Sequence, residues 1–297
     1  MADMREGRFT TPDGIQLYYQ AHLPVGKPSA VLLVVHGAGD HSGRYQGVFN
    51  NLLPQGIAVY CYDQRGYGRS PGQRGHINDW SEYRQDLRTF IDLVHNEQSS
   101  LPIFVWGYGL GGLVVTDAIL HETHYLSGAI IMSAPFKPSE AAQPALALAA
   151  KALSFTWPNF SLKLAAPMEK FTRDPKIIQA AQNDPLMHKQ ASARRGSESE
   201  RTIQWVNKHS GDIYLPILIL HGEADQLNAV EGARQFYEKV TYPDKMLITY
   251  PGGCHELHND LIRGQVLVDM MKWIQCHIQV PAAEPAPEAE DHPVPVM

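Results

Sequence analysis

The sequence has few cysteines and no concentrated positive charge. The first shortage disfavours a disulfide-stabilised protein and the second a nucleic-acid-binding protein. Its three cysteines, Cys61, Cys254 and Cys276, are odd in number and far apart, so a disulfide framework is a poorer explanation than a reducing compartment. The net charge is −6 at pH 7, and only Arg194-Arg195 hints at a basic surface. We therefore expect no nucleic-acid partner, since binding to phosphates requires a concentrated basic face.

Long apolar runs are also missing. No window approaches the roughly 18 consecutive apolar residues of a membrane-spanning helix, and residues 1–7 lack the apolar core of a signal peptide. We expect a cytoplasmic protein whose contact with membranes is at most peripheral. The 297 residues, 44% of them hydrophobic and 19% charged, suit one large globular domain or a domain with an insertion.

Apolar, β-branched runs alternate with helical patterns along most of the chain. Residues 8–23 have the pattern of a hairpin around Pro12-Asp13-Gly14. The runs that we expect to be strands are 30–35, 57–62, 101–106, 128–132, 215–220 and 245–250. The segments with helical spacing are 45–53, 80–94, 110–120, 229–240 and 261–276. This alternation predicts an α/β fold, a mostly parallel sheet with helices on both faces.

The alternation breaks after Ser133-Ala-Pro-Phe136. Residues 137–208 are rich in alanine and proline and predict an inserted helical cap. Residues 1–136 and 209–280 then form the two parts of the core. The tail 281–297 is rich in proline, alanine and acidic residues, and we expect it to be disordered.

A glycine-rich turn follows the strand predicted at 101–106 and supports two interpretations. Gly107, Gly109 and Gly112 form the G-x-G-x-x-G fingerprint of a dinucleotide-binding fold. The same turn matches a G-x-S-x-G nucleophile elbow in which Gly109 takes the place of the serine. A dinucleotide fold places its fingerprint after the first strand and an acidic residue after the next, and this sequence does neither. We therefore expect no nucleotide or other cofactor.

The elbow interpretation accounts for more of the chain. An α/β-hydrolase needs an oxyanion loop upstream of the elbow, then an acid and a histidine in that chain order. His36-Gly37-Ala38 follows a predicted strand, and Asp225 and His255 each follow a later one. The backbone N–H groups of Ala38 and Leu110 are the expected oxyanion donors. The sequence thus predicts an active site at one edge of the sheet, with Asp225 and His255 beside Gly109.

These segments resemble those of monoacylglycerol lipases and lysophospholipases in the α/β-hydrolase superfamily. The resemblance covers roughly residues 10–277, and its matching segments are His36–Tyr45, Asp63–His76, 107–112, Asn183–Leu186, 221–225 and 250–260. It implies an α/β-hydrolase fold and hydrolysis of a single-chain lipid ester by a Ser-Asp-His triad. In this chain Asp225 and His255 would be the triad partners, with Ala38 and Leu110 in the oxyanion hole. A lysophospholipase or a general short-chain esterase is the alternative within the superfamily.

Gly109 departs from the family pattern, because it carries no hydroxyl group where the family has its nucleophile. Without that oxygen the acyl-enzyme route is closed. We consider an inactivated hydrolase the better explanation, because a binding protein has no use for an Asp225–His255 pair at an absent oxygen. The alternative is a natural pseudoenzyme that binds lipid without cleaving it.

Further residues are candidates for contact with the substrate. Those expected to bind the head group are His36, Gly37, Asp40, Arg44, Tyr108 and His258. Asp40 and Arg44 could instead only pair with each other to fix a loop. The segments His255-Glu-Leu-His258 and His121-Glu-Thr-His124 are one residue too short for H-E-x-x-H, so we expect no metal site.

The cap carries an apolar series that could line an acyl tunnel or contact a membrane peripherally. Its members are Leu146, Leu148, Leu153, Phe155, Trp157, Phe160, Leu162 and Leu164. Most of such a series normally packs the cap on the core. We therefore expect only a minority of these side chains to contact lipid.

Overall fold

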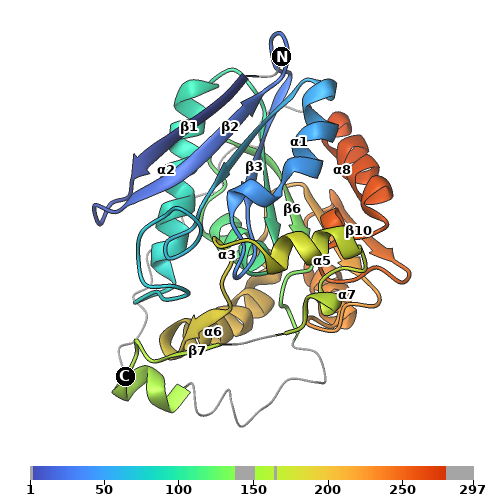
Figure 1. Ribbon diagram of the computed structural model, residues 1–297. Coiled ribbons are helices and arrows are strands. Elements are labelled where there is room, and N and C mark those ends of the chain that lie inside the picture. The colour runs from blue at the N-terminus through green and yellow to red at the C-terminus, as the bar shows by residue number, and fades with distance from the viewer. Residues whose placement is uncertain (1–2, 138–150, 164–165, 279–297) are drawn as a thin grey trace.

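The computed structural model describes residues 3–137, 151–163 and 166–278, and within them the predicted mostly parallel sheet is confirmed (Figure 1). Eight strands form one sheet in the order β1-β2-β4-β3-β5-β6-β9-β10. Their bounds are β1 (Asp3–Thr10), β2 (Gln16–Leu23), β3 (Ala30–Val35), β4 (Ile57–Tyr62), β5 (Ile103–Tyr108), β6 (Leu126–Met132), β9 (Ile217–Gly222) and β10 (Lys245–Tyr250). The hairpin β1–β2 is antiparallel and joins β4 antiparallel, whereas the strands from β4 to β10 pair in parallel.

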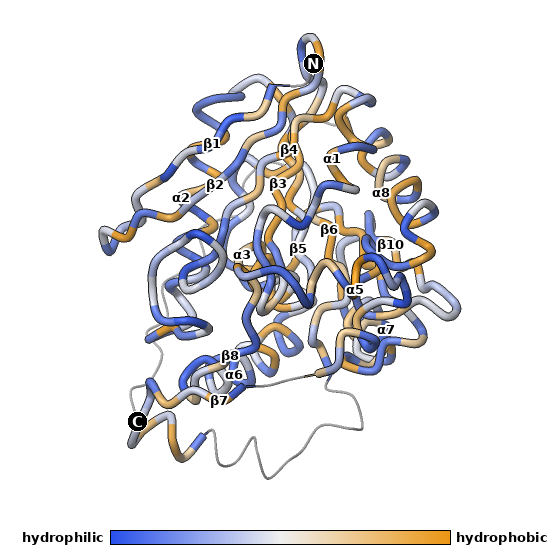
Figure 2. Tube along the Cα trace, in the orientation of Figure 1, coloured by the Kyte–Doolittle hydropathy of each residue, from blue (hydrophilic) through white to orange (hydrophobic). Residues whose placement is uncertain are grey.

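Helices cover both faces of the sheet. Successive side chains of the central strands point to opposite faces, so each face is apolar and is buried under its own layer of helices. Val31, Leu33 and Val35 join the core under α2 (Ser81–Glu97), α3 (Leu110–His121) and α7 (Val230–Lys239). Leu32 and Val34 join the second core, under α1 (Gln46–Leu52) and α8 (Arg263–His277). Figure 2 shows the hydrophobic residues concentrated along these central strands. A strand buried on both faces therefore has a continuous apolar sequence.

The segment between β6 and β9 leaves the sheet and forms the cap, which is less purely helical than predicted. It contains a helical stretch at 151–156, α5 (Pro175–Gln182) and α6 (Ala193–His209). It also contains two short strands, β7 (Ser161–Lys163) and β8 (Gln190–Ser192), which pair antiparallel. Three-residue strands are too short to show an alternating pattern, so periodicity could not reveal them. The predicted helical cap thus also contains a small two-stranded sheet.

The described part of the cap lies at the end of the molecule toward which the arrows of β3 and β6 point (Figure 1). α6 packs on α3, with the His121 and Trp205 rings stacked at 4.6 Å. The predicted tail 281–297 and the cap residues 138–150 and 164–165 lie outside the described residues. Of the helices within the described ranges, none is long and apolar enough to cross a membrane.

The first turn of α3 packs so closely on the end of β3 that a side chain at Gly111 would not fit, which gives a testable consequence for stability. A Cβ atom at Gly111 would lie 2.1 Å from the Val35 carbonyl oxygen. We expect Gly111→Ala to lower the free energy of unfolding by about 3 kcal/mol, because the contacted atom is backbone and cannot move aside easily. Gly47→Ala in α1 is the matched control, since its Cβ would meet no atom within 4 Å. It should raise the free energy of unfolding by about 0.5–1 kcal/mol.

Urea denaturation followed by circular dichroism measures both changes. Equal stability of Gly111→Ala and Gly47→Ala would show that the β3–α3 contact is looser than the 2.1 Å separation implies.

Candidate active site

Four loops meet at the carboxyl edge of the sheet, where parallel strands place their functional groups. Residues 36–44 follow β3, and Gly109 follows β5. Asp225 lies after β9 and His255 after β10. These loops bring together side chains that are up to about two hundred residues apart along the chain.

Asp225 and His255 form a buried pair. His255 Nδ1 lies 2.7 Å from Asp225 Oδ2, and the Asp225 side chain is fully buried. The other oxygen, Asp225 Oδ1, accepts the backbone N–H groups of Leu227 at 2.8 Å and Asn228 at 3.0 Å. Because a carboxylate can only accept, the His255 proton lies on Nδ1 and the Nε2 lone pair faces away from Asp225.

The charge of Asp225 is stabilised by its surroundings. Burial alone would raise the pKa of the Asp225 carboxyl. Electrostatic attraction and hydrogen bonding to the neighbouring imidazoles, His255 first and then His221, outweigh burial, so the pKa is held well below its usual range. The carboxylate therefore stays ionised at neutral pH and can stabilise a protonated His255.

Gly109 faces the free nitrogen of His255. Its backbone has φ +55° and ψ −117°, a conformation that side-chain-bearing residues rarely adopt. A Cβ atom built on Gly109 would lie 3.4 Å from His255 Nε2. A side-chain oxygen one bond farther out could therefore reach hydrogen-bonding distance of that nitrogen.

The expected oxyanion donors lie on the two segments next to Gly109. Leu110 is the first residue of α3, and the first N–H groups of a helix have no partner within that helix. The Cβ position of Gly109 lies 3.9 Å from Gly37 Cα, so the loop that carries Ala38 is its neighbour. Gly37 itself lacks room for a side chain, because a Cβ there would lie 2.6 Å from the Tyr108 ring.

His36 has a different role in the structure from the substrate contact that we expected. The ring is fully buried, with Nδ1 2.8 Å from the Gly37 carbonyl oxygen and Nε2 accepting the Gln64 backbone N–H at 3.0 Å. Both ring nitrogens are thus occupied by backbone groups. The Gly37 carbonyl and the Ala38 N–H belong to one trans peptide and point in opposite directions. By holding the carbonyl, His36 fixes the direction of the Ala38 N–H.

A polar cluster lies beside the Asp225–His255 pair. Arg44 Nη1 is 3.0 Å from Asp40 Oδ1 and 3.0 Å from Glu256 Oε1. The Tyr45 hydroxyl donates to Asp40 Oδ2 at 3.0 Å. Burial would lower the pKa of Arg44, but Glu256 and Asp40 outweigh it and raise the pKa above its usual value. The pairing of Asp40 with Arg44 is therefore present, and Glu256, which the sequence did not indicate, is its third member.

His258 lies beside this polar cluster but makes no hydrogen bond within the described residues. Its buried ring stacks on Tyr45 at 5.0 Å and meets the edges of Trp106 at 5.1 Å and Tyr108 at 4.9 Å. Neither ring nitrogen has a hydrogen-bond partner among the described residues. Burial lowers the pKa of His258 to about 4, so the ring is neutral at pH 7. A buried polar group without a partner is uncommon, and the fully buried ring lies in the core beside the site and does not face a surface that a ligand could reach.

The cap is tied to the loop after β3 by contacts that spacing could not predict. His41 Nε2 lies 2.8 Å from Asp184 Oδ2, although 143 residues separate them. The His188 backbone N–H donates to the Gly39 carbonyl at 3.2 Å. The only signal for these contacts in the sequence is that residues 183–186 belong to a segment that resembles the family. Phe171 adds an edge contact to the His255 ring at 5.5 Å.

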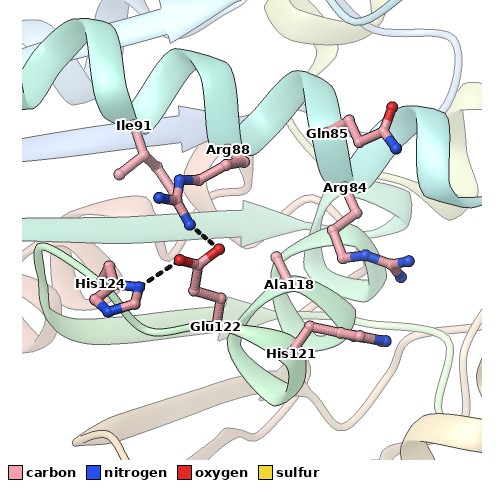
Figure 3. A pocket seen from close by; sticks show the side chains of 8 residues that line it. All are labelled: Arg84, Gln85, Arg88, Ile91, Ala118, His121, Glu122 and His124. Atoms are coloured by element: carbon pink, nitrogen blue, oxygen red, sulfur yellow. Dashed lines mark hydrogen bonds and ion pairs between the residues drawn. The ribbon is translucent and has the colours of Figure 1, made fainter. Parts of the chain in front are cut away.

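A hollow between α2 and α3 is separate from this site (Figure 3). It has a volume of about 180 Å³ and is lined by Arg84, Gln85, Arg88, Ile91, Ala118, His121, Glu122 and His124. Its charges are already paired: Arg84 with Asp117 at 2.8 Å, and Arg88 and His124 with Glu122. The hollow lies at the opposite end of α3 from Gly109. Within the described ranges, no group of three or more His, Cys, Asp or Glu side chains is arranged to hold a metal ion.

The sequence and the fold are similar to those of several known proteins. Residues 26–262 match the family described as serine aminopeptidase, S33. A monoacylglycerol lipase of Mycolicibacterium smegmatis is 30% identical over 92% of this chain and 98% of its own length. The monoglyceride lipase of Rattus norvegicus is 30% identical over 93% of this chain and 92% of its own length. The crystal structure of Paleococcus ferrophilus monoacylglycerol lipase superposes with a TM-score of 0.79 at 26% identity, over 93% of this chain and 99% of that one.

Proposed function

The chain belongs to the monoacylglycerol lipase-like α/β-hydrolases of the serine aminopeptidase S33 family, and from this premise we propose that its site binds single-chain lipid esters but lacks the nucleophile that cleaves them. One observation carries this proposal. A Cβ atom at Gly109 would lie 3.4 Å from His255 Nε2, while His255 Nδ1 is bound to Asp225. The base and the acid are in the order and geometry of a triad, and only the side-chain oxygen is missing.

In the complete site each group has a defined task. A serine oxygen at position 109 attacks the ester carbonyl, and His255 Nε2 takes its proton. Asp225 keeps His255 in the required tautomer and stabilises the imidazolium. The N–H groups of Ala38 and Leu110 hold the oxyanion. His255 then returns the proton to the leaving alcohol, and water releases the fatty acid from the acyl-enzyme.

The chain as it stands has only a slower route. His255 Nε2 can accept a proton from a water molecule that attacks the carbonyl directly, and the same proton then passes to the departing alkoxide. This step yields the same fatty acid and alcohol without an acyl-enzyme. We expect turnover by this route to be very low, because the attacking oxygen is not fixed on the protein.

The polar cluster supports a neutral hydroxyl-bearing head group. Two carboxylates, Asp40 and Glu256, surround one guanidinium, Arg44, so the cluster has an excess of acidic groups. The excess negative charge disfavours a phosphate-bearing head group relative to a neutral, hydroxyl-bearing one. These charges favour monoacylglycerols over lysophospholipids as ligands of this chain.

The experiment that tests the proposal assays Gly109→Ser on monoacylglycerols, lysophosphatidylcholine and short p-nitrophenyl esters. We expect hydrolysis of monoacylglycerols at a kcat/KM at least 10-fold above that for the lysophospholipid, a discrimination of about 1.4 kcal/mol. A folded Gly109→Ser that is inert on every ester would overturn the proposal and leave a lipid-binding protein without catalysis. Rapid hydrolysis by the unmodified chain, abolished by His255→Ala, would show that the nucleophile lies elsewhere.

Exposed apolar side chains on the cap support peripheral contact with a lipid surface. Phe155 is 76% exposed and Trp157 is 61% exposed, and both lie in residues 151–163. Removing both in Phe155→Ser/Trp157→Ser should weaken binding to phosphatidylcholine vesicles containing monoacylglycerol by about 10-fold or more, since aromatic side chains anchor proteins in the interface. Vesicle sedimentation measures the change.

A matched control replaces two exposed apolar residues on another part of the surface. Leu261 is 59% exposed and Val268 is 48% exposed, both near α8. If Leu261→Ser/Val268→Ser weakens vesicle binding as much as the cap variant, the cap is not the contact surface.

A further inference from the structure

Asp225 has a second imidazole neighbour besides His255. His221 lies near the end of β9 and is fully buried. Its Nε2 is 3.3 Å from Asp225 Oδ2, the same oxygen that His255 Nδ1 approaches at 2.7 Å. The same Nε2 is 3.0 Å from the Asn228 carbonyl oxygen. Two histidines therefore converge on one oxygen of the acid.

The surroundings of His221 decide where its proton lies. The Asn228 carbonyl and the Asp225 carboxylate can only accept hydrogen bonds, so Nε2 must carry the hydrogen that faces them. His221 Nδ1 is buried and has no hydrogen-bond partner in the part of the chain that the structure describes. A lone pair there costs less than a buried N–H group without an acceptor. The ring is thus a donor whose N–H is shared between Asn228 and Asp225.

The two oxygens of Asp225 are held by different parts of the protein. Oδ1 is bound by backbone N–H groups of the 227–228 loop, the loop to which Asp225 itself belongs. Oδ2 is the oxygen that must face His255, and its other neighbour is His221. Because His221 lies on β9, which pairs with both β6 and β10, its position is set by the sheet and not by the loop. The χ2 angle of an aspartate is soft, so a fixed donor at Oδ2 limits its rotation.

We propose that His221 is a positioning residue, whose Nε2–H holds the Asp225 carboxylate in the orientation that receives the His255 Nδ1–H. This inference rests on the proposed function to the extent that Asp225 and His255 are its acid and base. His221 touches no substrate. It acts through Asp225 and so determines how precisely the imidazole is aimed at position 109.

The test compares His221→Gln, which keeps a donor near the Nε2 position, with His221→Asn, whose shorter amide cannot reach Asp225. Low-field proton NMR of the unmodified chain at low temperature should show the His255 Nδ1–H resonance, assigned by its loss in His255→Gln. We expect His221→Gln to keep this resonance, and His221→Asn to lose it or shift it upfield. His277→Asn is the control, since His277 is also buried and contacts a carboxylate, Asp244 at 3.0 Å, but lies away from the site.

A second test measures kcat and KM of the His221 variants in the Gly109→Ser background. There, His221→Asn should lower kcat about 10-fold with little change in KM, and His221→Gln should restore most of the loss. Identical resonances and kcat values in the two variants, or loss of the resonance in folded His221→Gln, would overturn the inference. If His221→Asn does not fold, the test rests on His221→Gln alone, and loss of the His255 Nδ1–H resonance in that folded variant overturns the inference. If Gly109→Ser is inert, the proposed function fails, but the NMR comparison still judges His221.

Discussion

Gly109→Ser is expected to raise the turnover of a monoacylglycerol by about 10⁵-fold or more over the unmodified chain, because removal of a triad serine costs about that much in related chemistry. The geometry supports a gain of this size. The new Cβ would lie 3.4 Å from His255 Nε2 and clash with no backbone atom. The Asp225–His255 hydrogen bond is already formed at 2.7 Å, so no further rearrangement is required. Release of fatty acid at constant pH measures the turnover.

Gly109→Ala is the matched control for this substitution. Alanine adds the same Cβ at φ +55° but no oxygen. Both variants should lose about 1–3 kcal/mol of stability, because a side chain in this backbone region is strained. Only the serine variant should gain activity. An alanine variant as active as the serine variant would show that the gain comes from a change in the turn and not from the oxygen.

Asp225→Asn in the Gly109→Ser background is expected to lower kcat about 10⁴-fold while leaving KM nearly unchanged. Asparagine keeps the size of the side chain and can still accept the Leu227 and Asn228 N–H groups. Its amide N–H would, however, donate to His255 Nδ1 and move the imidazole proton to Nε2. His255 could then no longer accept the proton of the serine. Steady-state kinetics with a p-nitrophenyl ester measure both constants.

Asp117→Asn provides the comparison for this loss. Asp117 is a buried carboxylate on α3 that pairs with Arg84 at 2.8 Å, far from position 109. We expect its replacement to change kcat by less than about 10-fold, since no reacting group touches it. A comparable loss in both variants would indicate general damage to the fold and not a role for Asp225 in the reaction.

The strands were predictable where the chain is buried on both faces. The runs 30–35 and 57–62 coincide with β3 and β4, because a central parallel strand must be apolar at every position. β5 begins two residues later than the predicted 101–106 and ends two residues later, so that it includes Gly107 and Tyr108. These two residues pair with Ile131 and Met132 of β6. Strand pairing thus overrides the local tendency of glycine to interrupt a strand.

The polar partners within the site were harder to predict. Asp225 and His255 follow from chain order and strand ends, which depend on topology alone. Glu256 and His221 are buried polar residues whose partners are set by tertiary packing, and no periodicity marks them. His221 lies in the segment His-Gly-Glu-Ala-Asp, four residues before Asp225. At a strand position, however, such a residue would normally be interpreted as part of the hydrophobic core. A buried histidine on a strand that leads to a catalytic acid is therefore worth testing as its hydrogen-bond donor.

The contacts between the cap and the loop after β3 have a thermodynamic consequence. His41 and Gly39 of that loop bind Asp184 and His188 of the cap, and the same loop carries the Ala38 N–H. Docking of this cap segment and order in the loop are therefore linked equilibria. By reciprocity, a ligand that binds the ordered loop more tightly must stabilise the docked segment by the same free energy. The free energy of ligand binding at the candidate active site and the free energy of docking the segment that carries Asp184 and His188 therefore report the same coupling.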